Sequence, residues 1–178
     1  MRIISGSARG SVLFSPLNNA RPTLDVVRES LFNILAPNIR GAAFLDLFSG
    51  SGAVGIEALS RGANSAVFVD VDTSVVRKNL IKTKLIDRAV ILKMDYAAAV
   101  RYLMLKGQAF DYVFADPPYN AGLVLKTAVV LAKNHILLPN GEIMIEYGKE
   151  EAEWVPPEEL FLERRKIYSN CIIDFFRM

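Results

Sequence analysis

The segment that decides the fold reads FDYVFADPPY and spans residues 110–119. Its first six residues are mostly aromatic or β-branched, which predicts a buried strand of a parallel sheet. Two consecutive prolines continue neither a strand nor a helix, because proline lacks the backbone N–H group and fixes φ. Residues 116–119 are therefore expected to form a stiff loop at the carboxyl end of this strand, where open α/β sheets bind their ligands. Asp116, the proline carbonyl groups and Tyr119 together suit a flat group that bears an amine, such as a nucleobase.

Strands and helices alternate on both sides of this segment. Strand patterns cover residues 43–47, 65–69, 89–93 and 142–147, and helix patterns cover residues 53–61, 73–84, 96–105 and 122–133. The short connections are typical of a doubly wound, mostly parallel α/β sheet. Near the C-terminus, two strand-like runs at 161–168 and 171–177 are joined by only two residues. A link of that length allows a hairpin but no parallel crossover, so we expect the sheet to end antiparallel.

The start of the chain has a different pattern. Two short β-prone runs, 2–5 and 11–14, flank a glycine-containing connection and predict a small β-hairpin. A helix is expected to begin near Leu24, with Thr23 as its N-cap.

Length and charge indicate one domain with two unequal parts. A chain of 178 residues with 52% hydrophobic residues fits a single core. We divide it into an N-terminal extension, residues 1–40, and a core, residues 41–178, which is expected to carry the functional site. The net charge is +2, but the extension carries five arginines against two acidic residues, whereas the core carries 16 basic and 17 acidic residues. This asymmetry favours a surface of the extension that faces a polyanion, with ordinary solvated arginines as the alternative.

Composition disfavours several kinds of site and location. Cys171 is the only cysteine, so no disulfide can form within the chain and a zinc cluster is disfavoured. His135 is the only histidine, and a Ser-His-Asp or Cys-His catalytic system would depend on it alone. We find no secretory signal, and no apolar run reaches the roughly 18 residues of a membrane span. We therefore expect a cytoplasmic protein that crosses no membrane and binds no metal.

A glycine-rich loop follows the first predicted strand of the core. Residues 46–55 read DLFSGSGAVG, which contains the spacing G-x-G-x-x-G, and Asp70 comes 20 residues after Gly50. This pattern is the fingerprint of a dinucleotide site, so a nicotinamide-dependent dehydrogenase stays open. A simple tight turn with two surface caps is a further alternative. Asp46, however, would repel a pyrophosphate and attract an ammonium group.

A ligand with a zwitterionic end, a ribose and an adenine fits three acidic side chains of the core. Asp46 would lie near the ammonium group, Asp70 near the ribose hydroxyls, and Asp95 near the adenine amine. Each follows or ends a different parallel strand, so all three are expected at the same edge of the sheet. Asp95 has an equally good alternative role as the N-cap of the helix that follows it.

With these motifs in place, the chain resembles the S-adenosylmethionine-dependent N-methyltransferases. It is most similar to the bacterial family that methylates guanine N2 in small-subunit (16S) ribosomal RNA. The resemblance spans nearly the whole chain and rests on RIIxGxxRG at 2–10, RPTxDxVRExLFN at 21–33, DLFSGSG at 46–52 and DPPY at 116–119. Ser5 stands where the family usually has Gly, Ser11 where it often has a basic residue, and Asp70 where Glu is frequent.

The resemblance implies a seven-stranded, Rossmann-like methyltransferase sheet with an antiparallel last strand, and S-adenosylmethionine as the methyl donor. It implies 16S ribosomal RNA as partner, free or in the small subunit, and we expect a monomer. The implied site residues are, for catalysis, Asp116, Pro117, Pro118 and Tyr119; for the cofactor, Thr23, Asp46, Phe48, Gly50, Gly52, Asp70, Asp95 and Tyr96; and for RNA phosphates, Arg2, Arg9, Arg21 and Arg28.

The predicted chemistry is an in-line methyl transfer to an exocyclic amine. The Asp116 carboxylate and the Pro117 carbonyl would accept hydrogen bonds from that amine, and Tyr119 would stack on the base. Such a loop holds any planar amine, so adenine N6 or another amine on nucleic acid or protein is the alternative substrate. Only the N-terminal motifs favour guanine in RNA. A third candidate function, after methylation of guanine and methylation of another amine, is that of a dehydrogenase or an inactive nucleotide-binding module.

Overall fold

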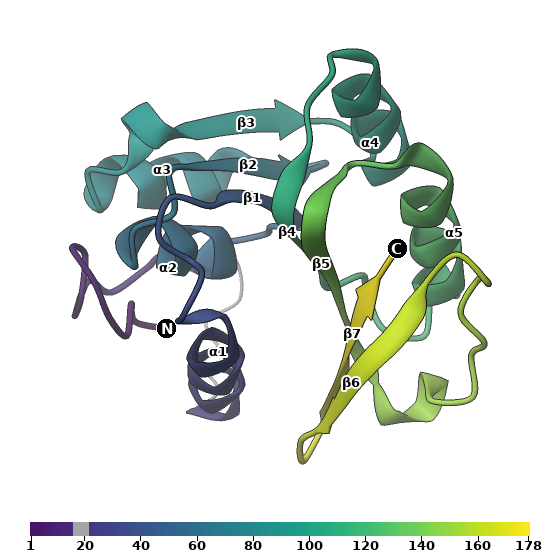
Figure 1. The fold of residues 1–178 in the computed structure, drawn as a ribbon. Helices are drawn as coiled ribbons and strands as arrows, with labels where there is room; N and C mark the ends of the chain where they lie inside the picture. The colour runs from purple at the N-terminus through teal and green to yellow at the C-terminus, as the bar shows by residue number, and fades with distance from the viewer. Residues whose placement is uncertain (16–21) are drawn as a thin grey trace.

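The computed structural model describes residues 1–15 and 22–178 and contains a seven-stranded sheet in the order β3-β2-β1-β4-β5-β7-β6 (Figure 1). The strands are β1 (Ala43–Leu47), β2 (Ser65–Asp70), β3 (Ala89–Lys93), β4 (Phe110–Ala115), β5 (Leu137–Gly148), β6 (Phe161–Ile167) and β7 (Cys171–Arg177). Strands β1 to β5 are parallel, and β7 is antiparallel to both β5 and β6. The predicted doubly wound sheet with an antiparallel end is therefore confirmed.

Five α-helices cover the two faces of the sheet. They are α1 (Pro22–Leu35), α2 (Ala53–Ser60), α3 (Ser74–Lys82), α4 (Tyr96–Leu105) and α5 (Leu123–Asn134). Helices α1, α2 and α3 lie on one face, and α4 and α5 lie on the other (Figure 1). None of the helices in the described part of the chain is long and apolar enough to cross a membrane.

The central strands are buried on both sides, as expected for a parallel sheet between two helical layers. Along β1, Phe44 packs into the core beneath α1, α2 and α3, whereas Leu45 packs into the core beneath α4 and α5. In β4, Phe114 packs into the first of these cores and Val113 into the second. Side chains that alternate along a strand in this way leave few exposed positions, so polar residues at strand ends stand out as candidates for function.

Strand β5 is longer than the sequence pattern predicted. It begins at Leu137 rather than at residue 142, and it contains the Pro139-Asn140-Gly141 turn as an irregularity. Phe110 of β4 pairs with Leu137, but Tyr112 pairs with Glu142, so β5 carries extra residues at this point. Asn140 has φ 65°, a left-handed conformation that Asn adopts more readily than most residues. The Pro-Asn-Gly segment is therefore irregular, as the sequence predicted, but it interrupts β5 instead of preceding it.

The N-terminal segment, residues 1–15, does not form the predicted two-stranded hairpin. One isolated antiparallel bridge joins Arg2 to Val12. The segment is held against α2 instead, because the buried carboxylate of Glu57 accepts hydrogen bonds from the backbone N–H groups of Ile4 and Ser5 at 2.8 and 3.0 Å. Backbone hydrogen bonds across the segment, from Ile3 N–H to Ser11 O at 3.0 Å and from Leu13 N–H to Met1 O at 3.1 Å, act together with these contacts to a distant helix to fix its conformation.

Helix α1 begins two residues earlier than predicted. Its first residue is Pro22, which suits the first turn of a helix because that position needs no backbone N–H donor. Thr23 is therefore the second helical residue, and the predicted N-cap role for it is wrong. Arg21 lies outside the described residues.

Candidate active site

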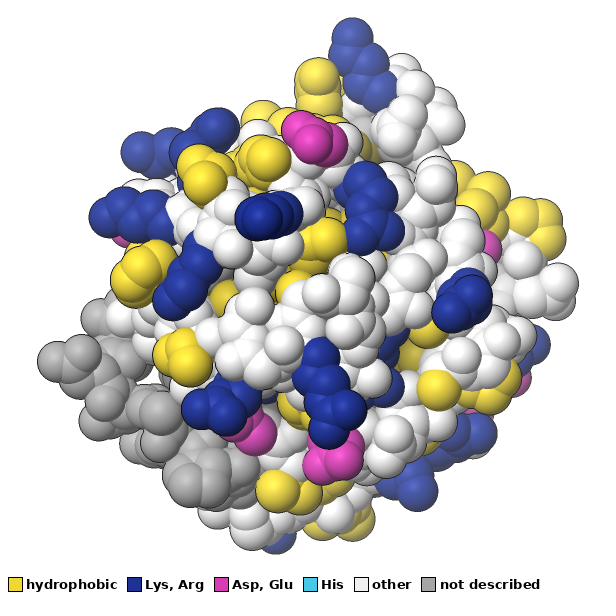
Figure 2. Space-filling model, turned by 90° about the vertical axis from the view of Figure 1, so that its left-hand side faces the viewer, with side chains coloured by type: hydrophobic (Ala, Val, Ile, Leu, Met, Phe, Trp, Pro, Cys, Tyr) yellow, Lys and Arg dark blue, Asp and Glu magenta, His cyan; other side chains and the backbone are white. Residues whose placement is uncertain are grey.

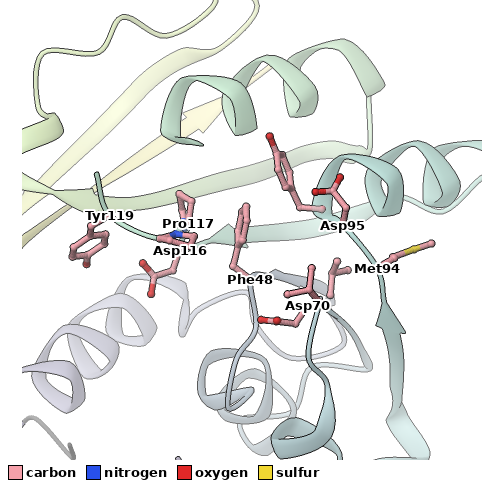
Figure 3. A pocket seen from close by; sticks show the side chains of 11 residues that line it. Phe48, Asp70, Met94, Asp95, Asp116, Pro117 and Tyr119 are labelled. Atoms are coloured by element: carbon pink, nitrogen blue, oxygen red, sulfur yellow. The ribbon is translucent and has the colours of Figure 1, made fainter. Parts of the chain in front are cut away.

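Four acidic residues meet at the carboxyl edge of the parallel strands. Asp46 lies in β1, Asp70 ends β2, Asp95 follows β3 and Asp116 follows β4. Asp70, Asp95 and Asp116 line a pocket of about 370 Å³ together with Phe48, Val69, Val71, Met94, Tyr96, Pro117, Pro118 and Tyr119. In Figure 3, Phe48 lies between the Asp116-Pro117 side of this pocket and the side that carries Asp70 and Met94. The parallel topology therefore brings together the acidic residues that the sequence analysis selected.

The glycine-rich loop and Asp70 are joined directly. One carboxylate oxygen of Asp70 accepts a hydrogen bond from the backbone N–H of Gly50 at 2.8 Å. The other oxygen accepts one from the backbone N–H of Asp72 at 3.0 Å. Gly52 has φ 76°, and a Cβ atom at this position would lie 2.4 Å from Val76 Cγ2. Glycine is required at this position for both conformation and space. The loop thus holds Asp70 at the pocket wall.

Asp95 serves as the N-cap of α4. One of its carboxylate oxygens accepts hydrogen bonds from the backbone N–H groups of Ala97 and Ala98 at 2.9 and 3.2 Å. The capping alternative is therefore confirmed. Asp95 also lines the large pocket, so its contact with a ligand stays a prediction that capping does not exclude.

Aromatic rings form part of the pocket wall. The rings of Phe48 and Tyr96 lie 4.9 Å apart between centroids, with an interplanar angle of 36°. Phe48 has φ 59°, a conformation that is uncommon for a bulky side chain and costs about 1 to 3 kcal/mol. Backbone strain of this kind concentrates at binding sites. With Val71 and Met94 nearby in the same pocket, these rings offer flat apolar contacts to a planar ligand.

A second, smaller pocket of about 120 Å³ adjoins the first and shares Phe48 and Asp116 with it. Its other lining residues are Met1, Val27, Arg28, Leu31, Asp46, Ser49, Ser51, Ala53, Val54, Phe114 and Glu146. Each pocket is lined by three carboxylates among apolar groups, but only the large one adds Tyr96 and the Pro-Pro-Tyr loop, and only the small one adds a guanidinium group, that of Arg28. Two chemically different compartments therefore meet at Asp116.

Asp46 is almost completely buried, with an exposed fraction of 2%. Burial raises the pKa of its carboxyl group from 3.8 to about 7, and the charge of Asp70 acts in the same direction. The backbone N–H of Gly55, which donates to Asp46 at 2.9 Å, partly opposes the shift. A cation in the small pocket would stabilise the charged carboxylate.

The Asp-Pro-Pro-Tyr loop is stiff and partly exposed. Pro117 is buried, while Pro118 and Tyr119 are exposed, and the Tyr119 side chain retains 41% of its accessible surface. Burial raises the pKa of Asp116 well above its ordinary value, and the charges of Glu146 and Asp46 add to this shift. The loop therefore presents an aromatic face and a carboxyl group with a high affinity for a proton.

Glu146 is a site residue that the sequence analysis missed. It belongs to β5, is 6% exposed and lines the small pocket with Asp116. The hydroxyl group of Tyr119 donates a hydrogen bond to its Oε1 at 3.1 Å. The signal that could have found it was an acidic residue inside the apolar strand sequence IMIEY, residues 143–147.

Three of the arginines predicted to bind RNA lie in the described part of the chain, and their environments differ. Arg2 and Arg9 are exposed and border a shallow hollow of the N-terminal segment. Arg28 is 4% exposed, and its guanidinium group bonds to the Arg2 carbonyl oxygen and to Asp25, the latter at 2.9 Å. Its burial is inconsistent with the predicted phosphate contact, and it lies in the wall of the small pocket instead.

Lys and Arg side chains are spread over one side of the molecule, with few Asp or Glu side chains among them (Figure 2). This side carries the N-terminal segment and helices α2 and α3 (Figure 1). Exposed residues of α3 add to it, namely Arg77, Lys78 and Lys82. Among the described residues, no group of three or more His, Cys, Asp or Glu side chains is arranged to hold a metal ion.

Comparison with known proteins adds a family and a fold. A family described as "Conserved hypothetical protein 95" matches residues 1–177. The chain is 39% identical over 178 residues to "Ribosomal RNA small subunit methyltransferase D" of Escherichia coli, covering 99% of this chain and 89% of that protein. The solved structure of a hypothetical protein from Thermus thermophilus superimposes with a TM-score of 0.84 at 29% identity, covering 100% of this chain and 99% of the other. An Agrobacterium tumefaciens SAM-dependent methyltransferase shares the fold at 16% identity, with a TM-score of 0.67 over 88% of this chain and 62% of the other.

Proposed function

The chain belongs to the family described as "Conserved hypothetical protein 95", and we propose that it methylates the N2 amine of a guanine in small-subunit ribosomal RNA. The methyl donor is S-adenosylmethionine, which supplies an electrophilic methyl group. The observation that carries this proposal is the meeting of two compartments at Asp116, one suited to a nucleoside and one suited to a charged amino-acid end. The name of the Escherichia coli relative supports ribosomal RNA as substrate.

The large pocket fits the nucleoside part of the donor. Asp70 is held by Gly50 at the pocket wall, where it accepts hydrogen bonds from ribose hydroxyls. Phe48 and Tyr96 provide flat contacts for the adenine ring, and Asp95 keeps acceptor capacity for the adenine amine beyond its capping bonds.

The small pocket fits the amino-acid end of the donor. Asp46 pairs with the ammonium group, which offsets the cost of a charged carboxylate at this depth. Arg28 lies in the same wall and supplies a positive charge for the carboxylate end. Gly52 belongs to the loop that backs this pocket, and the side chain of Thr23, also predicted to contact the donor, is not described by the structure.

Asp116 and Pro117 act on the acceptor base. An exocyclic amine is a poor nucleophile because its lone pair is delocalised into the ring. When the carboxylate and the Pro117 carbonyl accept its two N–H groups, the nitrogen moves toward a tetrahedral geometry and its lone pair becomes available. The N–C bond forms as the S–C bond breaks, and the nitrogen then loses one proton. Asp116, whose pKa is raised by burial, is a suitable acceptor for that proton.

Tyr119 and the N-terminal segment hold the RNA. The exposed Tyr119 ring stacks on a base that has left its helix, a contact worth about 1 to 3 kcal/mol. Arg2 and Arg9 are exposed and provide phosphate contacts that add affinity without reading sequence.

The test is transfer of labelled methyl from S-adenosylmethionine to small-subunit ribosomal RNA taken from cells that lack this gene. RNA is supplied free and in assembled subunits, and the labelled nucleoside is identified and mapped. Label in N2-methylguanosine is the expected result, and label in another nucleoside or in protein contradicts the proposed substrate.

Asp116→Ala is the matched variant for this test. It should lower methyl transfer by about 100-fold or more while donor binding, measured by calorimetry, stays within a few-fold of wild type. The exposed Asp87→Ala is the control. Equal loss of donor binding and transfer in Asp116→Ala would show that Asp116 holds the donor or the fold rather than the base.

A further inference from the structure

Glu146 lies inside β5, and Asp116 follows directly after the neighbouring strand β4. In the parallel pairing of β4 with β5, Ala115 is opposite Ile145, so the next residue on each strand is an acidic one. Adjacent strands are about 4.8 Å apart, and both residues line the small pocket. The strand order β1-β4-β5 puts Glu146 on one side of Asp116 and Asp46, which is assigned to the donor, on the other side. Two carboxylates are therefore presented to the same space beside the Asp-Pro-Pro-Tyr loop.

The surroundings of Glu146 leave it with unused acceptor capacity. Tyr119 donates to Oε1, which ties the carboxylate to the aromatic ring of the loop. Burial raises the pKa of Glu146, and Cys171 and Tyr119 partly oppose the shift. Within residues 1–15 and 22–178, no Lys or Arg forms an ion pair with it. A carboxylate with two oxygens accepts several hydrogen bonds, so a buried group that faces only the Tyr119 hydroxyl and the Cys171 thiol is suited to receive another from a ligand.

The two carboxylates match the edge of guanine rather than that of adenine. In guanine the exocyclic N2 amine lies next to N1–H, so the edge presents adjacent donors. In adenine the exocyclic amine lies next to an unprotonated N1, which is an acceptor and would face a carboxylate unfavourably.

We propose that Glu146 selects guanine by accepting a hydrogen bond from N1–H while Asp116 and Pro117 hold the N2 amine. This assignment rests on the proposed function and adds the residue that distinguishes guanine from other bases that carry an amine. Glu146 thus determines which base is accepted, and the hydrogen bond from the Tyr119 hydroxyl orients its carboxylate.

The experiment removes the N1 proton and keeps the N2 amine; the base used also lacks O6, a difference that affects wild type and variant alike. The guanine mapped by the methyl-transfer assay is substituted by 2-aminopurine in a ligated small-subunit RNA, which keeps the N2 amine but has an unprotonated N1. Wild-type protein is expected to methylate guanine about 10- to 100-fold faster than 2-aminopurine, because the carboxylate then faces an acceptor.

Glu146→Gln is the test variant. Its amide oxygen still accepts the Tyr119 hydroxyl, while its amide N–H group can donate to the unprotonated N1. The variant is expected to lose activity on guanine and to gain on 2-aminopurine, so that the ratio of kcat/KM values falls by at least about tenfold.

Two controls make the outcome decisive. Tyr119→Phe removes the hydroxyl that bonds to Glu146 but leaves the carboxylate, so its base ratio should stay closer to wild type than that of Glu146→Gln. S-adenosylmethionine binding by each variant reports on folding. An unchanged ratio in Glu146→Gln overturns the proposal whether or not total activity falls. Absence of transfer by wild type to the guanine substrate contradicts the proposed function itself, which separates the two failures.

Discussion

At the scale of single residues, Asp46 is the group whose charge is most sensitive to what occupies the site. Folding raises its pKa from 3.8 to about 7, so the folded state favours the protonated form. This group therefore lowers the stability of the free protein as pH rises from 3.8 through 7. A bound ammonium group has the opposite effect, because it favours the charged carboxylate. Donor binding and deprotonation of Asp46 are thus expected to be coupled.

The coupling predicts that S-adenosylmethionine binds more tightly as pH rises through 7. Between pH 8 and pH 6, wild-type affinity should fall by about tenfold, because Asp46 becomes mostly protonated. Asp46→Asn should bind more weakly at pH 8 and lose most of this pH dependence, since Asn cannot ionise. Calorimetric titrations at several pH values measure both profiles. Asp70 and Asp116 are present in both proteins, so parallel profiles would show that Asp46 is not the group responsible.

At the scale of elements, the N-terminal segment and α2 form one packed unit. Gly6 lies against the end of α2, and a Cβ atom at this position would be 1.8 Å from the Ser60 carbonyl oxygen. The Ser60 hydroxyl accepts a hydrogen bond from the backbone N–H of Ala8 at 2.9 Å. Glu57 anchors the same segment from the preceding turn of the helix. The predicted hairpin is therefore reduced to a short antiparallel pairing, with backbone bonds such as Ile3 N–H to Ser11 O and Leu13 N–H to Met1 O. The bonds to a helix about 50 residues away hold this pairing in place.

Two glycines of this segment provide a matched pair of substitutions. Gly6 and Gly10 have nearly equal φ values, 85° and 83°, but a Cβ atom at Gly10 meets nothing within 4 Å. Gly10→Ala should therefore cost about 1 to 2 kcal/mol, from backbone strain alone. Gly6→Ala should cost at least about 3 kcal/mol, because a backbone contact must also open. Chemical denaturation measures both, and equal losses would mean that the segment is not docked on α2.

At the scale of the whole molecule, the N-terminal segment connects a basic surface to the donor site. The Asn79 side chain hydrogen-bonds to the backbone of Phe14 and to the carbonyl oxygen of Ser51 in the glycine-rich loop. Met1 lines the small pocket. Removal of the segment would therefore disturb the donor site as well as the basic surface, so substitutions of exposed arginines are the cleaner test of RNA binding.

The double substitution of Arg2 and Arg9 by Ala should weaken RNA binding evenly across sequences. It should also reduce the slope of log affinity against log salt by roughly 1.4 to 1.8, because two phosphate contacts are lost. Arg164→Ala with Lys166→Ala on β6 is the matched control, since both residues are exposed on the opposite edge strand. Filter binding at several salt concentrations measures the slopes. Equal slopes for the two double variants would place the RNA surface elsewhere.

Local sequence determined most of the sheet and the edge that carries the site. Alternating strand and helix patterns predicted the doubly wound order, and the two-residue link predicted the antiparallel end, because these properties depend on nearest neighbours along the chain. The Asp-Pro-Pro-Tyr loop and the glycines at 50 and 52 were found for the same reason. Asp46, Asp70, Asp95 and Asp116 were expected at one edge because all parallel strands end there.

Only the tertiary structure decided which side chains face one another across that edge. Glu146 meets Asp116 because of the register between β4 and β5, and Arg28 is buried because the N-terminal segment packs over α1 and α2. The β5 irregularity and the docking of residues 1–15 on Glu57 likewise depend on partners distant in sequence. The register of paired strands and the long-range hydrogen bonds depend on how the packed layers fit together. The residue pattern of one segment does not specify which distant segment it will contact.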